Sequence, residues 1–277
     1  MRNKFWVLLL CCCGVLSAQC VDQQEARVES LLQAARTLPA DSNRVIFYGH
    51  RLAGTPYVAN TLDGMKQECM VVNTAEVDCM TFVEYVLALT LCDRDGEYDY
   101  KSFVHKLQRI RYRNGRIDGY ASRLHYFSDW MMEAEKNGFL NEVTHELPGA
   151  KLRTFYLNFM SEHADSYKAL KNDSIALKHI AMIEQNRNPL TTYYIDKERL
   201  NLSKKELKIE NGDLLALTTA IQGLDVVHLG FAYWKNGKLH LLHASMKEKQ
   251  VIFDEISLYD YLKNRKKHTG VRVGRCC

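Results

Sequence analysis

The segment "DCMTFVEYVLAL" at residues 78–89 constrains the fold most strongly, because its apolar side chains lie on nearly every side of a helix. Asp78 is a favourable residue to precede a helix, so the pattern predicts a helix that begins at Cys79 and runs to about residue 92. A helix without a polar face must be covered on all sides. The chain is therefore expected to fold around this helix, with Cys79 held in its first turn.

The C-terminal part of the chain favours strands, since short β-favouring runs bounded by Gly, Asn, Asp and Lys follow residue 209. These runs are LLALTT, VVHLGFAYW, KLHLLHAS, QVIFDEI and VRVGR. The earlier part instead shows the apolar spacing of helices. Predicted helices cover about 23–38, 42–54, 79–92, 101–109, 120–136 and 165–186. Together the two parts predict an α+β fold in which the Cys79 helix packs against a central antiparallel sheet.

Asn236-Gly237 lies between two of these runs and is the strongest short-range signal for a two-residue hairpin turn. The turn fixes a register in which Tyr233 faces His240. Because side chains alternate along a strand, His228 and His243 then share one face, while His240 points from the other. His228 and His243 are diagonal neighbours in this register, so their imidazoles are expected to meet.

A catalytic cysteine needs a base, which is most often an imidazole oriented by a third polar group. The predicted hairpin supplies two imidazoles, and Gly230 opposite His243 is expected to leave space for a reacting group. The helix dipole and the free amides of a helix start favour a thiolate at Cys79, as would an imidazolium at His228. The alternative interpretation is a plain core thiol and two partly buried histidines that serve the sheet.

The first 20 residues predict a secretory signal, because Arg2 and Lys4 precede an apolar run that is too short to span a bilayer. The protein is therefore expected to be exported to the periplasm or cell envelope. Cys20 is a candidate site for a lipid anchor, and such an anchor would be the protein's only link to a membrane. Residues 21–277 are expected to form a single domain with a helical insertion at about 95–205.

The charge balance and the short motifs exclude several classes of protein. Without the signal, the 37 basic side chains fall to 35 against 33 acidic ones, and this net charge of +2 gives no case for nucleic-acid binding. The cysteines lack the regular spacing of a disulfide scaffold, and their pairing stays open. "HEL" at 145–147 lacks the second histidine of a zinc motif, and His240 and His243 point to opposite faces of a strand. No metal and no cofactor are predicted, and a monomer is expected.

An ordered set of motifs resembles those of the NlpC/P60 cell-wall hydrolases, which are papain-like cysteine enzymes. The motifs are "GTPYV" at 54–58, "DC" at 78–79, "HLGFAY" at 228–233 and "HAS" at 243–245. With "RYRNGRIDGYASRLHYFSDW" at 111–130, the set resembles more closely the DUF1460 family, an N-acetylmuramoyl-L-alanine amidase-like branch of that superfamily. Met80-Thr81 stands where many NlpC/P60 enzymes have a small serine-glycine step, which favours the DUF1460 branch.

The resemblance implies a papain-like NlpC/P60 core within the α+β fold, with the nucleophile helix packed on the sheet. It also implies catalytic roles for three residues. Cys79 would be the nucleophile, His228 the general base and acid, and His243 the residue that orients His228.

The resemblance further implies positions for four residues near the substrate. Tyr57 would line the catalytic cleft, and Asp78 would be the acidic residue beside the nucleophile. Arg123 and Tyr126 would lie near the substrate, although helix packing and a surface charge would explain them equally well. The arginine-rich run at 109–116 could meet stem-peptide carboxylates or form a solvated loop.

The expected activity is cleavage of the N-acetylmuramoyl-L-alanine amide bond of peptidoglycan, or of muropeptides during their recycling. Two alternatives stay open. One is an endopeptidase that cuts within the stem peptide, between D-glutamate and the diamino acid. The other is a non-catalytic lipoprotein that binds cell-wall fragments.

Overall fold

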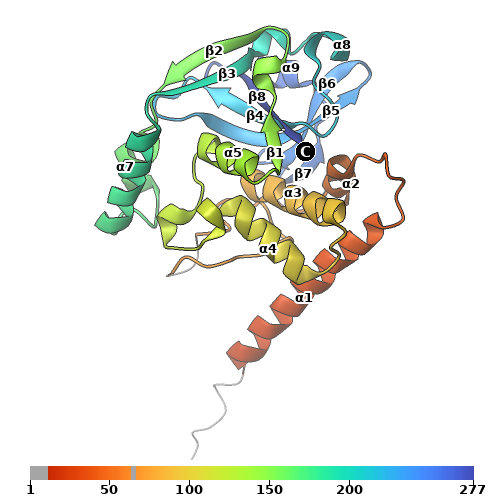
Figure 1. The fold of residues 1–277 in the computed structure, drawn as a ribbon, viewed down its shortest axis with the longest axis vertical. Coiled ribbons are helices and arrows are strands. Elements are labelled where there is room, and N and C mark those ends of the chain that lie inside the picture. The colour runs from red at the N-terminus through yellow and green to blue at the C-terminus, as the bar shows by residue number, and fades with distance from the viewer. Residues whose placement is uncertain (1–11, 64–66) are drawn as a thin grey trace, which may run out of the picture.

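The computed structural model describes the backbone of residues 12–63 and 67–277, and the side chains of this range from residue 22 onward. The α-helices are α1 (Cys12–Ala35), α2 (Arg44–Arg51), α3 (Cys79–Asp95), α4 (Tyr100–Arg111), α5 (Phe127–Lys136), α6 (Phe159–Glu162), α7 (Ser174–Arg187), α8 (Lys204–Leu207) and α9 (Leu258–Leu262). Short 3-10 turns lie at Arg113–Gly115, Tyr120–Ser122, Thr144–Glu146, Ala164–Ser166 and Lys197–Arg199. Helices α3, α4 and α5 lie side by side below the sheet in Figure 1, and α1 extends away from the body.

One antiparallel sheet contains the strands found in the described part of the chain. The strands are β1 (Leu140–Glu142), β2 (Ala150–Phe155), β3 (Leu190–Asp196), β4 (Leu214–Thr219), β5 (Val226–Lys235), β6 (Lys238–Ser245), β7 (Gln250–Phe253) and β8 (His268–Cys276). Their order is β2-β3-β8-β4-β5-β6-β7, and β1 also pairs with β8 (Figure 1). The named pairs are antiparallel, so the α+β prediction is confirmed.

The five predicted C-terminal strands are present as β4 to β8, and the predicted helices correspond to α1 to α5 and α7. The segment 95–205, predicted as a helical insertion, also contributes β1, β2 and β3 to the sheet. These strands escaped prediction because β1 is very short, while β2 and β3 leave apolar side chains such as Leu152 and Tyr193 exposed. Their strand structure depends on pairing with each other and with the distant β8, which no local pattern shows.

The N-terminal helix α1 passes through residue 20, where the predicted signal ends. Residues 1–11 of that predicted signal lie outside the described residues. The later part of α1 packs on the core through Val28, Leu32 and Ala35. In residues 12–63 and 67–277, no helix combines the length and the apolar character needed to cross a membrane.

Two apolar clusters lie on opposite faces of the sheet. Alternate side chains of β4 show the division, since Leu214 and Ala216 belong to the first cluster and Leu215 and Leu217 to the second. The first cluster surrounds α3, in which every residue from 81 to 92 is buried. This confirms the prediction that the Cys79 helix is central to the fold.

The hairpin between β5 and β6 has the predicted turn and register. Asn236 and Gly237 have φ angles of 51° and 74°, as a two-residue turn of this type requires. Tyr233 faces His240, and the ladder runs from the turn to Phe231 and Leu242.

A buried ion pair joins α3 to α4. Nε of Arg111 donates to Oε2 of Glu84 at 2.7 Å, and the two side chains are 0% and 2% exposed. Arg111 also donates through Nη1 to the carbonyl oxygen of Val71 at 2.6 Å. Burial raises the pKa of Glu84, and the charge of Arg111 opposes that rise. The pair therefore fixes both helices and part of the segment that leads to Cys79.

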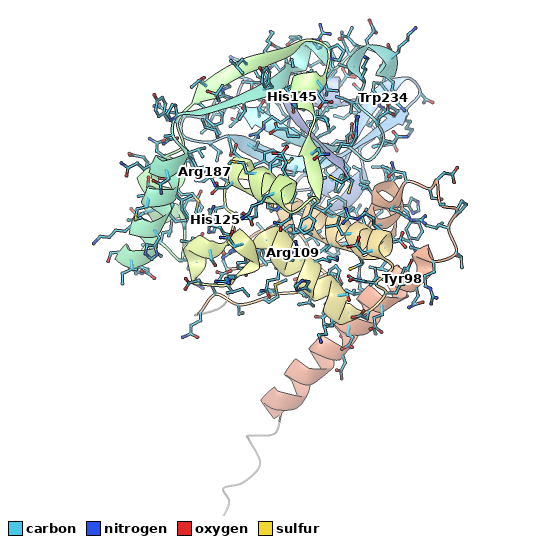
Figure 2. All side chains as sticks on the ribbon, viewed as in Figure 1. Tyr98, Arg109, His125, His145, Arg187 and Trp234 are labelled. Atoms are coloured by element: carbon cyan, nitrogen blue, oxygen red, sulfur yellow. The ribbon has the colours of Figure 1, made fainter. Side chains whose placement is uncertain are left out.

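Asp129 on α5 joins two further segments to the core. Its buried carboxylate accepts from Nη2 of Arg113 at 2.6 Å and from Nε of Arg187 at the end of α7, which Figure 2 labels. The loop that follows α4 and the helix α7 are thus both anchored on α5.

Replacing Glu84 by leucine should destabilise the protein by about 3–5 kcal/mol, because Arg111 would stay buried without its counter-ion. Urea unfolding followed by circular dichroism measures the change. The double variant Glu84→Leu/Arg111→Met should recover much of the loss, since apolar residues of similar volume can replace a buried pair. A single variant as stable as the parent would show that Arg111 does not depend on Glu84.

Candidate active site

Cys79 is the first residue of α3, and its helix start is fixed by a capping box. Oδ1 of Asp78 accepts from the amide of Thr81 at 2.8 Å, and the Thr81 hydroxyl oxygen accepts from the amide of Asp78 at 2.9 Å. The predicted role of Asp78 as helix cap is confirmed. Because the helix behind this cap is buried, the half-buried Cys79 side chain has little freedom of position.

Tyr57 lies beside this helix start. Its extended backbone forms a bridge with Val77, and its amide donates to the carbonyl oxygen of Lys249 at 2.8 Å. Burial, followed by the charges of Cys79 and Asp78, raises the pKa of Tyr57 to about 12. Tyr57 and Asp78 therefore both lie close to the thiol.

The imidazoles of His228 on β5 and His243 on β6 meet, as the hairpin register predicted. Nε2 of His228 lies 2.6 Å from Nδ1 of His243, and the rings are nearly perpendicular at 85°. His228 immediately precedes Leu229, whose backbone amide approaches the sulfur of Cys79 closely enough to lower its pKa. Since Nε2 of His228 is engaged with His243, Nδ1 is the ring nitrogen of His228 left for another partner.

The space predicted at Gly230 is filled, and that prediction was wrong. A side chain at Gly230 would meet the carbonyl oxygen of Leu242 at 2.7 Å and Cβ of His243 at 2.9 Å. The two strands approach closely just beyond the end of their ladder, and glycine permits this approach. Gly230 therefore brings the histidine-bearing strands together rather than opening a cavity.

Asp254 adds a third polar group behind the two histidines, and the sequence analysis missed it. Its Oδ2 lies 3.4 Å from Nε2 of His243. Burial would raise the pKa of Asp254, but the His243 ring and the Ile256 amide hold it below its usual range. The only sequence signal was an acidic pair at the end of "QVIFDEI". The structure thus places Asp254, His243 and His228 in one series.

The thiol of Cys79 is protonated at neutral pH. Burial, and then the carboxylate of Asp78, raise its pKa to about 12, while the amides of Leu229, Cys79 and Met80 oppose the rise. The expectation of a thiolate was therefore wrong. The loss of water and the neighbouring negative charge outweigh the effect of the helix start.

His228 is neutral at the same pH. Burial, followed by the charge of His243, lowers the pKa of His228 to about 3. A neutral imidazole beside a neutral thiol can accept the thiol proton at the moment when sulfur attacks a substrate. The arrangement thus has the parts that nucleophilic acyl transfer needs.

Arg123 lines a cavity of about 660 Å³. Its guanidinium donates to Oδ1 of Asp63 and to Oε2 of Glu68, both at 3.1 Å, and its side chain lies over the ring of Tyr120. Arg123 is therefore neutralised by two carboxylates at the wall of this cavity. Its contact with a substrate stays a prediction.

Tyr126 belongs to a third, smaller apolar cluster and is only 3% exposed. Its hydroxyl donates to Oε1 of Glu184 at 2.6 Å and accepts from the amide of Met160 at 3.0 Å. These are the contacts of a packing residue. A substrate contact of Tyr126 also stays a prediction.

Metal binding and disulfide formation are two further kinds of chemistry that concern the described residues. In this part of the chain, no cluster of three or more His, Cys, Asp and Glu side chains is placed to hold a metal ion. The thiols of Cys69, Cys79, Cys92, Cys276 and Cys277 are free.

The structure is an α+β fold in which Cys79 lies at a buried helix start and His228 and His243 meet on the β5–β6 hairpin. A family model described as AmiA-like, N-acetylmuramoyl-L-alanine amidase-like, matches residues 48–271. The chain belongs to this family, and the resemblance stated from the motifs is confirmed. A search of curated proteins gives no match.

Solved structures agree with this assignment. A structure from Bacteroides fragilis, described as a proposed xylanase, is 43% identical over 82% of this chain and 98% of that chain, with a TM-score of 0.77. An N-acetylmuramoyl-L-alanine amidase from Bacteroides uniformis is 39% identical over 84% and 97%, with a TM-score of 0.79. A DUF1460 protein from Legionella pneumophila, 24% identical over 94% and 96%, shares the fold with a TM-score of 0.69.

Alkylation of Cys79 by iodoacetamide should be slow at about pH 7 and rise roughly tenfold per pH unit up to about pH 9, because only the thiolate reacts. Mass spectrometry of the digested protein measures the rate, with the exposed Cys277 as an internal reference for the reagent. A Cys79 rate that is already constant below about pH 7 would contradict the raised pKa and indicate a stable thiolate.

Proposed function

We propose that this protein hydrolyses the amide bond between N-acetylmuramic acid and L-alanine, in peptidoglycan or in released muropeptides, with Cys79 as the nucleophile. The observation that carries the proposal is the ordered series of Cys79, His228 and His243 on a rigid helix start and a hairpin. Membership of the amidase-like family and the similarity to the Bacteroides uniformis amidase support the choice of bond.

The reaction begins when Nδ1 of His228 takes the proton of Cys79 and the sulfur attacks the amide carbonyl carbon. Backbone amides at the start of α3 stabilise the negative oxygen of the tetrahedral intermediate. The carbon–nitrogen bond breaks as His228 returns the proton to the leaving amine of L-alanine. Water, deprotonated by His228, then hydrolyses the thioester and regenerates the thiol.

His243 and Asp254 act as positioning residues in this scheme. We assign the hydrogen of the His228–His243 contact to Nε2 of His228, which then donates to Nδ1 of His243, while Nε2 of His243 lies 3.4 Å from Oδ2 of Asp254. This assignment of tautomers leaves the lone pair of Nδ1 of His228 free for the Cys79 proton.

The proposal also includes a papain-like core, export and a monomeric protein. The helix start at Cys79, placed against the hairpin, supports a papain-like core with Tyr57 and Asp78 at the cleft. The N-terminal segment supports export, with Cys20 as a candidate lipid anchor and a monomer as the working form.

The described carboxylates beside the site do not favour glycoside hydrolysis, the activity in the name of the Bacteroides fragilis structure. A glycosidase of the usual kind needs two carboxyl groups that act on the substrate. Asp78 is engaged with Thr81, and Asp254 faces His243. A cysteine hydrolase accounts for these groups better.

Incubation with a defined muramoyl tetrapeptide should release an intact peptide that begins with L-alanine, as detected by mass spectrometry. Cys79→Ala should lower the rate by at least about 1000-fold, because the nucleophile is lost. Cys69→Ala is the matched control, since it removes another partly exposed thiol.

Each other outcome supports a different function. A shortened peptide would support the endopeptidase that cuts after D-glutamate. Binding of the tetrapeptide without cleavage, unchanged in Cys79→Ala, would support the non-catalytic module. Hydrolysis of xylan in a separate assay would support a glycosidase.

Asp254→Asn should lower kcat by about 10–100-fold with little change in KM, because the tautomer and orientation of His243 are no longer fixed. The carbonyl oxygen of residue 254, which accepts from Tyr233 and His240, is unaffected by this change. Glu255→Gln removes the same charge at the next, exposed position and should be neutral. An equal fall in kcat for both variants would contradict the role of Asp254.

A further inference from the structure

The wall of the site beyond the two histidines is formed by α9 and the turn that leads into β8. Tyr261 on α9 places its ring edge-on to His243, with 5.9 Å between ring centroids. Burial raises the pKa of Tyr261, the charge of Arg265 opposes the rise, and Asp254 and an ionised Cys79 add to it. Tyr261 therefore lies within reach of both the thiol and the orienting histidine.

Arg265 is held against this tyrosine. Its guanidinium carbon lies 4.1 Å from the centroid of the Tyr261 ring, and its Nε donates to the carbonyl oxygen of Tyr261 at 2.9 Å. The backbone of Arg265 is fixed as well, because its carbonyl oxygen accepts from the amide of His268 and from Nζ of Lys197. Stacking on an aromatic ring orders the plane of an arginine side chain before any ligand binds.

The two terminal nitrogens of Arg265 are left for a ligand. Among the described side chains, no carboxylate pairs with Arg265, whose side chain is exposed. Arg111 and Arg113, from the run that could meet peptide carboxylates or form a solvated loop, are instead paired with Glu84 and Asp129. Those two arginines are paired with carboxylates inside the fold, whereas Arg265 beside the site has no such partner among the described side chains.

The electrostatic surroundings of Arg265 favour an anion. Its charge reaches His228, where it acts with burial and with His243 to lower the pKa. Lys197 adds a second positive charge, since its Nζ contacts the Arg265 backbone, whereas the nearby Lys247 is paired with Glu248. A negative group beside His228 would relieve this repulsion.

We propose that the guanidinium of Arg265, stacked on Tyr261, is a subsite for a carboxylate of the peptide on the leaving-group side of the scissile amide. This inference rests on the proposed amidase function. His228 must give its proton to the leaving amine, so the leaving peptide lies on the His228 side, where Arg265 is found. The terminal nitrogens match a carboxylate in a bidentate fashion.

The chemistry of the stem peptide supplies a matching group. The residue after L-alanine is D-glutamate joined through its side-chain carboxyl, which leaves its α-carboxylate free. This carboxylate lies within about two extended residues, or ~7 Å, of the leaving nitrogen. Arg265 would therefore select stem peptides whose second residue carries a free acid over those in which it is amidated.

The test compares two substrates, N-acetylmuramoyl-L-alanyl-D-glutamate and its α-carboxamide, N-acetylmuramoyl-L-alanyl-D-isoglutamine. The parent enzyme should prefer the acid by about 10–100-fold in kcat/KM, the range of a charge-assisted hydrogen-bonded pair. Arg265→Gln should bring this ratio close to one, mainly by raising KM for the acid. Arg265→Lys should retain part of the preference for the acid, because lysine keeps the positive charge but lacks the two terminal nitrogens that bind a carboxylate together.

Lys263→Gln is the matched control, since it removes the same charge two residues earlier from a lysine already paired with Asp260. The substrate ratio is measured within each enzyme sample, so partial loss of folded protein cancels. Suppose that Arg265→Gln cuts both substrates at the alanine amide with the same kcat/KM ratio as the parent. This result would overturn the proposed subsite and leave the proposed amidase function standing. Failure of the parent to cut either substrate at that bond would overturn both.

Discussion

The burial of α3 over residues 81–92 is the constraint on which the rest of the structure depends. A helix buried over residues 81–92 needs other helices on one side and a sheet on the other. Its capped start then reaches the sheet at the point where β5 and β6 stop pairing. This packing brings Cys79 to the backbone amide of Leu229 on β5, the residue that follows His228. The packing of the core therefore determines where the thiol lies.

Charge is distributed unevenly across the site. Asp78 stabilises the start of α3 as its cap, which is typically worth about 1 kcal/mol. The same carboxylate raises the pKa of Cys79 and so disfavours a resting thiolate. Beyond His228 lie the positive charge of Arg265 and the carboxylate of Asp254, which faces His243. A neutral thiol–imidazole pair between these charges is suited to forming the ion pair only when a substrate is present.

The parts of the site that could be predicted from sequence depend on local signals. The cap at Asp78 and the turn at Asn236 each fix a register within a few residues, and the pairing of His228 with His243 follows from that turn. Asp254 could not be found in this way, because its place depends on how the chain leaves β7. The same holds for the outer strands, which exist only through contacts with distant β8.

The sequence also could not show how strongly burial acts on ionisable groups. The helix start alone suggested a thiolate at Cys79, but the effect of lost water depends on all the elements that cover the helix. Arg123 illustrates the same limit. Its guanidinium is surrounded by Asp63 and Glu68, which are far from it in the chain.

The placement of the thiol on the most deeply packed helix also affects how the protein responds to thermal motion. Amide hydrogens in such a helix exchange with solvent only when the whole domain opens, whereas outer strands such as β2 and β3 open locally at a far lower cost in free energy. Fluctuations of these outer strands therefore leave the sulfur in place. The outer strands and the helix that carries the thiol differ in local stability.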